Sequence, residues 1–171
     1  VEVTDVQTGS SVTSNEITVT TPQAAFSANT VTVDSGDSGK ISINLQSADT
    51  ATVTVGSKAT GYLANVTVKD GDGDSAIRLE WDTHLAGETS GVSDDFSVAD
   101  SDDEITQTEI DSAAQPDDSV DTGTYDLAVR TGTDPSVKSQ SSAAIVVEGR
   151  SGGGSSTGTE PTAETSTKDP N

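Results

Sequence analysis

Apolar and polar residues alternate on both sides of an aspartate-rich turn between positions 61 and 82, and this alternation restricts the stretch to β structure. Every second residue from Tyr62 to Val68 is apolar, and the same holds after the turn from Ile77 to Trp81. Successive side chains of a strand point to opposite faces of a sheet. The stretch is therefore predicted to be a hairpin whose two strands each turn one face toward a core.

Short runs of the same alternation recur from Ala24 onward, separated by turn residues at intervals of about 8 to 12 residues. Besides the hairpin, they occupy residues 31–33, 41–45, 53–55, 125–129 and 143–147. This spacing is typical of an all-β sandwich, for which we expect about seven to nine strands.

The signal weakens across residues 83–119, where acidic residues dominate. Short strands are expected at residues 96–98 and 105–110, and a short helix over residues 104–114 is an alternative with poor apolar spacing. We expect this segment to be an elaborated, solvated excursion from the sheets.

The sequence divides into three parts. Residues 1–22 are expected to form an N-terminal strand segment or the end of a preceding module, because the proline at position 22 suits a boundary. Residues 23–149 hold the alternating runs and are expected to form the sandwich. Residues 150–171 have no apolar side chain larger than that of alanine, which predicts a flexible Gly/Ser/Thr/Pro-rich linker or stalk. The chain does not begin with methionine, which favours a processed product or a fragment.

The chain is strongly acidic, with eight basic residues, 29 acidic ones and a net charge of -21. Such a charge repels nucleic acid and anionic lipid surfaces, so neither is an expected partner. In molar salt the Debye length falls to about 3 Å, which screens the self-repulsion. The composition therefore favours a folded domain suited to concentrated salt over the alternative of a disordered, solvating chain.

Several kinds of chemistry are excluded by what the sequence lacks. Without cysteine the fold has no disulfides, and with His84 as the sole histidine a transition-metal site is disfavoured. No apolar run approaches the roughly 18 to 20 residues of a membrane span, so no direct span is expected in this chain. No nucleophile elbow or other catalytic spacing accompanies the many serine and aspartate residues, so we expect no enzyme.

Asn65 begins the one N-glycosylation sequon of the chain, Asn65-Val66-Thr67. The alternation places Asn65 on the face opposite Tyr62 and Val66, so a glycan attached there would point to solvent. Sequons also occur by chance. Asn65 is therefore a candidate glycosylation site.

Asp70, Asp72 and Asp74 alternate with glycine, a pattern that suits calcium binding through carboxylate oxygens. An EF-hand loop starting at Asp70 would need glycine where Ser75 stands and glutamate where Trp81 stands, so that motif is not met. The alternative is a hairpin turn in which aspartate and glycine tolerate positive φ. The sequence therefore leaves two alternatives, a bound calcium ion or no cofactor. If calcium binds, we expect Asp82 or the acidic excursion to provide further ligands.

Trp81 has two interpretations, as the anchor of the core or as a platform on which a sugar ring stacks. Its parity with Ile77 and Leu79 favours the core, because a sandwich with so few aromatic residues needs it there.

Asp121, Gly123 and Tyr125 form a D-x-G-x-Y pattern at the start of an alternating run. The spacing resembles the tyrosine corner of immunoglobulin-like domains, in which the tyrosine hydroxyl bonds back to the chain just before a core strand. We expect these residues, like Trp81, to have structural roles.

The resemblance to a known family rests on three stretches: GYLANVTVKDGDGDSAIRLEWDT from residue 61, DTGTYDLAVR from residue 121 and AAIVVEGR from residue 143, followed by the Gly/Ser/Thr/Pro tail. Over residues 24–150 the chain resembles the immunoglobulin-like repeats of haloarchaeal surface glycoproteins of the S-layer type. The resemblance implies an immunoglobulin-like β-sandwich, an extracellular location at the cell surface, a structural or adhesive role and no catalytic residues. Its implied partners are sister domains or identical subunits of a surface assembly, and glycans.

The leading hypothesis is a structural module of an extracellular archaeal cell-envelope or surface-layer glycoprotein that assembles through domain contacts in high salt. One alternative is an adhesin or carbohydrate-binding module. Another is a filament subunit in which residues 1–22 add as a strand to the open edge of a neighbour.

Overall fold

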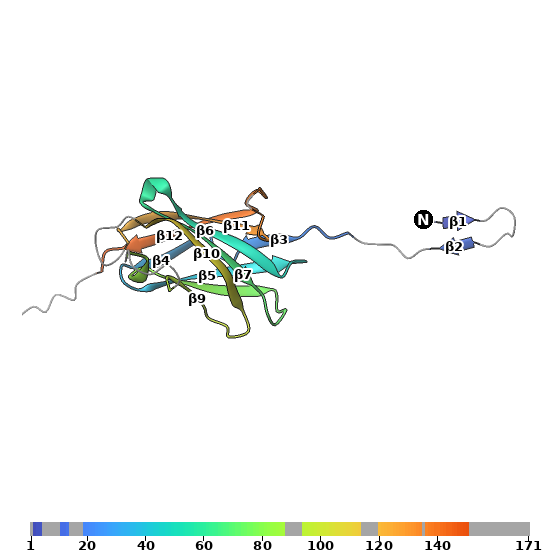
Figure 1. Cartoon of the computed structure of the whole chain (residues 1–171), viewed down its shortest axis with the longest axis horizontal. Coiled ribbons are helices and arrows are strands. Elements are labelled where there is room, and N and C mark those ends of the chain that lie inside the picture. The colour runs from blue at the N-terminus through green and yellow to red at the C-terminus, as the bar shows by residue number, and fades with distance from the viewer. Residues whose placement is uncertain are drawn as a thin grey trace, which may run out of the picture.

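Strands make up nearly all of the regular structure. The computed structural model of the chain describes residues 2–4, 11–13, 19–87, 94–113, 120–134 and 136–150. In these residues the chain forms twelve strands and two short 3-10 helices (Figure 1). The elements are β1 (Glu2–Thr4), β2 (Ser11–Thr13), β3 (Gln23–Phe26), β4 (Thr30–Asp34), β5 (Ser38–Gln46), β6 (Thr50–Ser57), η1 (Lys58–Thr60), β7 (Tyr62–Lys69), β8 (Ala76–Asp82), η2 (Leu85–Gly87), β9 (Phe96–Val98), β10 (Glu104–Ala113), β11 (Gly123–Thr131) and β12 (Ser141–Glu148).

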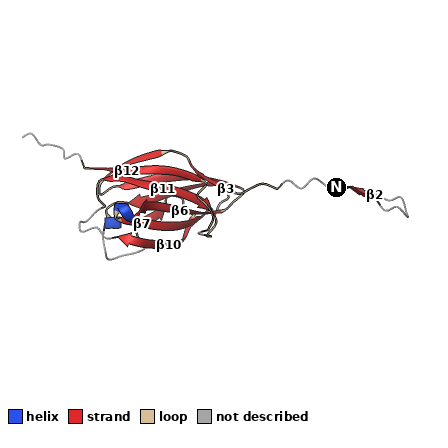
Figure 2. Cartoon of the chain, turned by 90° about the horizontal axis from the view of Figure 1, so that it is seen from above, coloured by secondary structure: helices blue, strands red, loops and turns tan. Residues whose placement is uncertain are grey.

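Ten of these strands form two sheets that pack face to face (Figure 2). The larger sheet has the order β10-β7-β6-β11-β12-β4, and the smaller sheet has the order β3-β5-β8-β9. Neighbouring strands are antiparallel except for β12 and β4, which run parallel. An all-β sandwich is thereby confirmed, with ten strands where about seven to nine were expected. The immunoglobulin-like assignment stays a prediction.

The core lies between the two sheets and follows the period-two pattern of the sequence. The residues of β7 and β8 that the alternation places inward are fully buried: Tyr62, Ala64, Val66, Val68, Ile77, Leu79 and Trp81. Alternate residues of β6, β11 and β12 join them. Burying a large apolar side chain contributes about 1.5 to 3 kcal/mol, so this inner layer supplies the main stabilisation of the fold.

The strands expected at residues 96–98 and 105–110 are confirmed as β9 and as part of β10, and they complete both sheets instead of forming a solvated excursion. β9 pairs with β8, and β10 pairs with β7 along the edge of the larger sheet, with register shifts between Ile105 and Gln107 and between Ile110 and Ser112. The helix proposed as an alternative for residues 104–114 is therefore wrong. An edge strand interrupted by bulges does not keep a period of two, which is why the alternation was weak there.

The first two strands form a separate hairpin. β1 pairs with β2, and the two make a sheet of their own. The two large sheets run from Gln23 to Glu148. Residues 151–171, which the sequence predicts to be a linker or stalk, lie outside the described residues.

Candidate functional site

Asn65 lies on β7, the strand next to the edge of the larger sheet, on the face directed away from the core. It is in register with Thr54 of β6 on one side and Glu109 of β10 on the other. Its neighbours Ala64 and Val66 are fully buried, whereas Asn65 is partly exposed. The Thr54 hydroxyl donates to Asn65 Oδ1 at 2.7 Å. This hydrogen bond does not involve Nδ2, the atom to which an N-linked glycan is joined.

A polar groove of about 270 Å³ runs beside Asn65 across β6, β7, β10 and β11. Its walls are formed by Thr52, Asn65, Thr67, Gln107, Glu109, Arg130 and Thr133. The hydroxyls of Thr52 and Thr67 meet at 3.1 Å, and Thr52 also donates to the carbonyl oxygen of Gly132 at 2.7 Å. The Nε of Arg130 is buried and has no hydrogen-bond partner among the described residues. Such a surface can accept the hydroxyl groups of a sugar. Sequence reasoning missed the groove, because its walls come from four strands that meet only in the folded sheet.

The turn between β7 and β8 is held by its own aspartates. The Asp70 carboxylate accepts the N–H groups of Gly73 at 2.7 Å and Ser75 at 2.9 Å, and Asp72 Oδ1 accepts the N–H of Asp74 at 3.0 Å. Gly73 and Ser75 have φ of +76° and +67°. The hairpin predicted for residues 61–82 is nevertheless wrong, because β7 belongs to the larger sheet and β8 to the smaller one, and the two strands do not pair. The positive φ expected of an aspartate and glycine turn is present, and Ser75 adopts a φ that glycine usually supplies.

The same turn gathers three carboxylates. Asp70, Asp72 and Asp74 each offer an oxygen, and these oxygens lie within 4.8 Å of one another. Asp82, which was expected to assist, lies at the opposite end of β8. The acidic segment does reach the turn, through Asp103, which immediately precedes β10.

Asp103 is 6% exposed although it is a carboxylate. Its Oδ1 accepts the N–H of Gly71 at 3.4 Å, and its Oδ2 is buried with no hydrogen-bond partner among the described residues. Burial raises the pKa of the Asp103 carboxyl, and the charges of Asp100, Asp70 and Asp72 raise it further against the opposing effect of the Gly71 bond. Nothing in the local sequence distinguishes Asp103 from the other acidic residues around it.

Trp81 lies at the centre of the core and offers no face to a ligand. The residue is fully buried, and its ring lies 5.3 Å from the rings of both Tyr62 and Tyr125, measured between centroids. The Tyr62 hydroxyl donates to Asp95 Oδ2 at 3.0 Å. Burial and then the charge of Asp95 raise the pKa of Tyr62, so the phenol stays neutral and keeps its proton for this bond.

Tyr125 bonds back to the chain that precedes its strand. Its hydroxyl donates to the carbonyl oxygen of Asp121 at 2.8 Å, across the start of β11 at Gly123. Burial and then the charge of Asp121 raise the pKa of Tyr125, which keeps the phenol a donor.

Tyr125→Phe should therefore lower the free energy of unfolding by about 1 kcal/mol, because it removes this hydrogen bond while the ring still fills the core. Urea unfolding followed by tryptophan fluorescence would measure the change. The matched control is Tyr62→Phe, which removes a bond to a buried carboxylate and should cost more. Equal stability of Tyr125→Phe and the unchanged chain would contradict a structural role for the hydroxyl.

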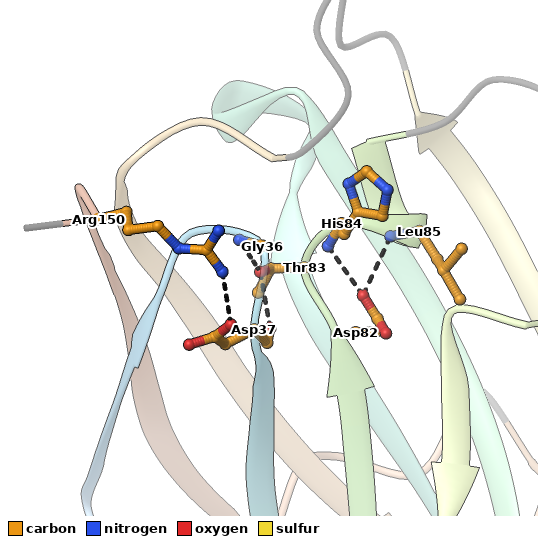
Figure 3. Close-up of polar contacts among 7 residues, drawn as sticks. All are labelled: Gly36, Asp37, Asp82, Thr83, His84, Leu85 and Arg150. Carbon is orange, nitrogen blue, oxygen red and sulfur yellow. Dashed lines mark hydrogen bonds and ion pairs between the residues drawn. The ribbon is translucent and has the colours of Figure 1, made fainter. Parts of the chain in front are cut away.

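Polar contacts also fasten the end of the sandwich from which the chain leaves after β12 (Figure 3). Thr83 is fully buried, and its hydroxyl donates to the carbonyl oxygen of Asp37 at 2.7 Å and accepts the N–H of Gly36 at 2.8 Å. Arg150 forms an ion pair of 2.9 Å with Asp37 Oδ1. The last described residue is thus joined to the turn between β4 and β5.

His84 lies in the loop after β8 and is exposed. The backbone N–H groups of His84 and Leu85 donate to Asp82 Oδ1 at 2.9 and 3.1 Å (Figure 3). The Asp82 carboxylate therefore holds the loop that carries His84.

These features define a class of protein: a β-sandwich module with an acidic composition and a glycosylation sequon displayed on an outer sheet face. A domain family described as "Domain of unknown function (DUF7827)" matches residues 17–132. The chain belongs to this family.

The chain is also 34% identical over 165 residues to a cell surface glycoprotein of Haloferax gibbonsii. The match covers 95% of this chain and 18% of the length of that protein, so the chain spans less than a fifth of its relative. The resemblance to haloarchaeal surface glycoproteins and the extracellular, cell-surface localisation are thereby confirmed.

Among solved structures, one chain from work on T cell specificity and activation by the bacterial superantigen toxic shock syndrome toxin-1 matches with a TM-score of 0.36 and 20% identity. It covers 75% of this chain and 100% of that chain. Within the described residues, no helix has the length and apolar character that a membrane crossing requires.

Proposed function

We propose that this chain is a structural module of an archaeal cell-envelope glycoprotein and that it assembles through contacts with sister modules or identical subunits in concentrated salt. The observation that carries the proposal is the match to a cell surface glycoprotein over 95% of this chain but only 18% of that protein. A unit that accounts for so small a share of a long surface protein serves best as one module in a row.

The sandwich supports a structural rather than an enzymatic role. Its largest aromatic residue is buried in the core, and the carboxylates of Asp70, Asp72 and Asp82 accept hydrogen bonds from backbone N–H groups that hold turns and loops. Electron microscopy of native envelope material, with antibodies against the chain, tests the proposal. A regular array labelled at the cell surface is the expected result, and label confined to the cell interior would overturn it.

The two alternative functions, a carbohydrate-binding module and a filament subunit, predict other results. A carbohydrate-binding module could not use Trp81 as a stacking platform, because Trp81 is fully buried. The polar groove beside Asn65 is the surface that could bind a sugar instead. A filament subunit built by strand addition through residues 1–22 would give fibres rather than a sheet in the micrographs.

We further propose that Asn65 carries an N-linked glycan that lies over the polar groove. The asparagine is partly exposed on the outer face, its Oδ1 is held by Thr54, and the hydroxyls of Thr52 and Thr67 line the surface beside it. A glycan there would cover polar groups of the sheet without touching the core.

Asn65→Gln should lower the mass of the chain secreted by a haloarchaeal host by the mass of one glycan, because it removes the acceptor nitrogen while keeping an amide. Intact-mass spectrometry measures the difference. Asn44→Gln is the matched control, since Asn44 is exposed on the smaller sheet and is not part of a sequon. A wild-type mass equal to that of the bare polypeptide would contradict the assignment.

A further inference from the structure

Two loops that connect the sheets meet at one end of the sandwich, and both are acidic. The turn at residues 70–75 leads from β7 in the larger sheet to β8 in the smaller one, and residues 99–103 lead from β9 in the smaller sheet back to β10 in the larger. Their backbones are in close contact, because a Cβ at Gly71 would collide with the carbonyl oxygen of Asp102. The loops therefore bring together carboxylates from two distant parts of the chain.

The carboxylate of Asp103 points into the turn, where its Oδ1 accepts the N–H of Gly71 between Asp70 and Asp72. The other oxygen, Oδ2, is buried without a partner among the described residues, on a side chain that is 6% exposed. Buried polar atoms nearly always have a partner, and a buried carboxylate needs a compensating charge. The neighbouring side chains of Asp70 and Asp72 are themselves acidic, so they cannot supply it.

A hard cation meets this requirement. Calcium binds six to eight oxygens at about 2.4 Å, so two oxygens on opposite sides of one ion lie about 4.8 Å apart. The oxygens of Asp70, Asp72 and Asp74 lie within 4.8 Å of one another, so one calcium ion can contact all three. Magnesium, with bonds of about 2.0 to 2.1 Å and a strict octahedron, draws its ligands closer together.

We propose that Asp70, Asp72 and Asp74 bind one calcium ion together with Asp103, which supplies from the second loop the side-chain ligand that the turn lacks. The sequence places Trp81 where an EF-hand has its bidentate glutamate, so a loop of that kind is incomplete by itself. Asp103, brought in by β10, fills the corresponding role. The bound ion joins the two loops, and through them the two sheets.

Equilibrium dialysis of the full chain against radioactive calcium, after removal of divalent cations and at constant high salt, tests the proposal. We expect about one calcium per chain with a dissociation constant of roughly 0.1 to 1 mM, the range of extracellular modules, and weaker competition by magnesium. Asp72→Asn and Asp103→Asn should each weaken binding by about tenfold or more. Asp126→Asn, an exposed aspartate on β11, should change binding by less than about twofold.

Thermal unfolding gives a second readout that does not depend on detecting bound ion. Calcium should raise the melting temperature of the unchanged chain, because a ligand that binds only the folded state stabilises it. Without calcium, Asp103→Asn should melt above the unchanged chain, since it removes a buried charge beside Asp70 and Asp72, and calcium should then have little effect. Absence of bound calcium at about 10 mM, or unaltered binding by Asp103→Asn, would overturn the proposal.

Discussion

Trp81→Ala is expected to destabilise the chain by about 3 to 5 kcal/mol, a large share of the stability of an ordinary domain. The ring is fully buried between Tyr62 and Tyr125, with centroids 5.3 Å from each, so its removal leaves a cavity that both neighbours border. These aromatic contacts add to the area that the tryptophan buries. Because Tyr62 comes from the larger sheet and Trp81 from the smaller one, the loss falls on the packing between the sheets.

Chemical denaturation followed by far-ultraviolet circular dichroism would measure this loss, since the variant lacks the tryptophan signal. Trp81→Phe keeps an aromatic ring and should cost distinctly less. Val19→Ala is the matched control for apolar truncation, because Val19 is 87% exposed and its loss should be nearly neutral. An unfolding midpoint for Trp81→Ala equal to that of the unchanged chain would refute the core role and reopen sugar stacking.

Transfer from molar salt to tens of millimolar salt should lower the melting temperature by many degrees. The net charge is -21, and the Debye length grows from about 3 Å at 1 M to about 30 Å at 0.01 M, so repulsion among the acidic groups is no longer screened. Exposed ion pairs offset little of such repulsion, because each contributes at most about 1 kcal/mol. Lys40–Glu80 at 3.8 Å and Arg150–Asp37 at 2.9 Å are examples in the described part of the chain.

Calorimetry across a sodium chloride series would measure this dependence. A variant that carries Glu109→Gln, Asp126→Asn and Glu148→Gln, all at exposed strand positions, should lose less stability on dilution, because it removes three charges and leaves the core intact. Runs with chelator present separate this general screening from bound calcium. A melting temperature independent of salt would remove the main support for adaptation to concentrated salt.

The alternation of apolar residues was sufficient to predict the strands that line the core. Tyr62 and Trp81 are buried and Asn65 faces outward as their parity requires, because each belongs to a strand with one face on the core. The same reasoning located the short strands at residues 96–98 and 105–110, but it underestimated the length of β10, because the bulges and the exposed Gln107 and Glu109 of this edge strand break the period of two. The order of the strands in the sheets could not be predicted either, because the pairing of strands that are distant in sequence does not affect the local spacing of apolar residues.

Among the candidate site residues, those close together in sequence could be predicted, and those brought together only by folding could not. Asp70, Asp72 and Asp74 are close in sequence, so a tight turn was enough to bring them together. Asp103 and Arg130 could not be recognised, because their surroundings come from segments far away along the chain. Their burial and unpartnered atoms become visible only when the loops and strands are packed.

The parallel pairing of β4 with β12 bears on how the module carries tension. β3 begins at one end of the sandwich, and β12 ends at the other (Figure 1). β4 and β12, which are the first and last strands of the larger sheet in chain order, pair over five register positions. Two further hydrogen bonds flank this pairing, from Ala144 N–H to the carbonyl oxygen of Asn29 at 3.0 Å and from Ser35 N–H to the carbonyl oxygen of Glu148 at 2.8 Å. A pull on the two ends acts along these strands, so their hydrogen bonds share the load in shear instead of opening one after another.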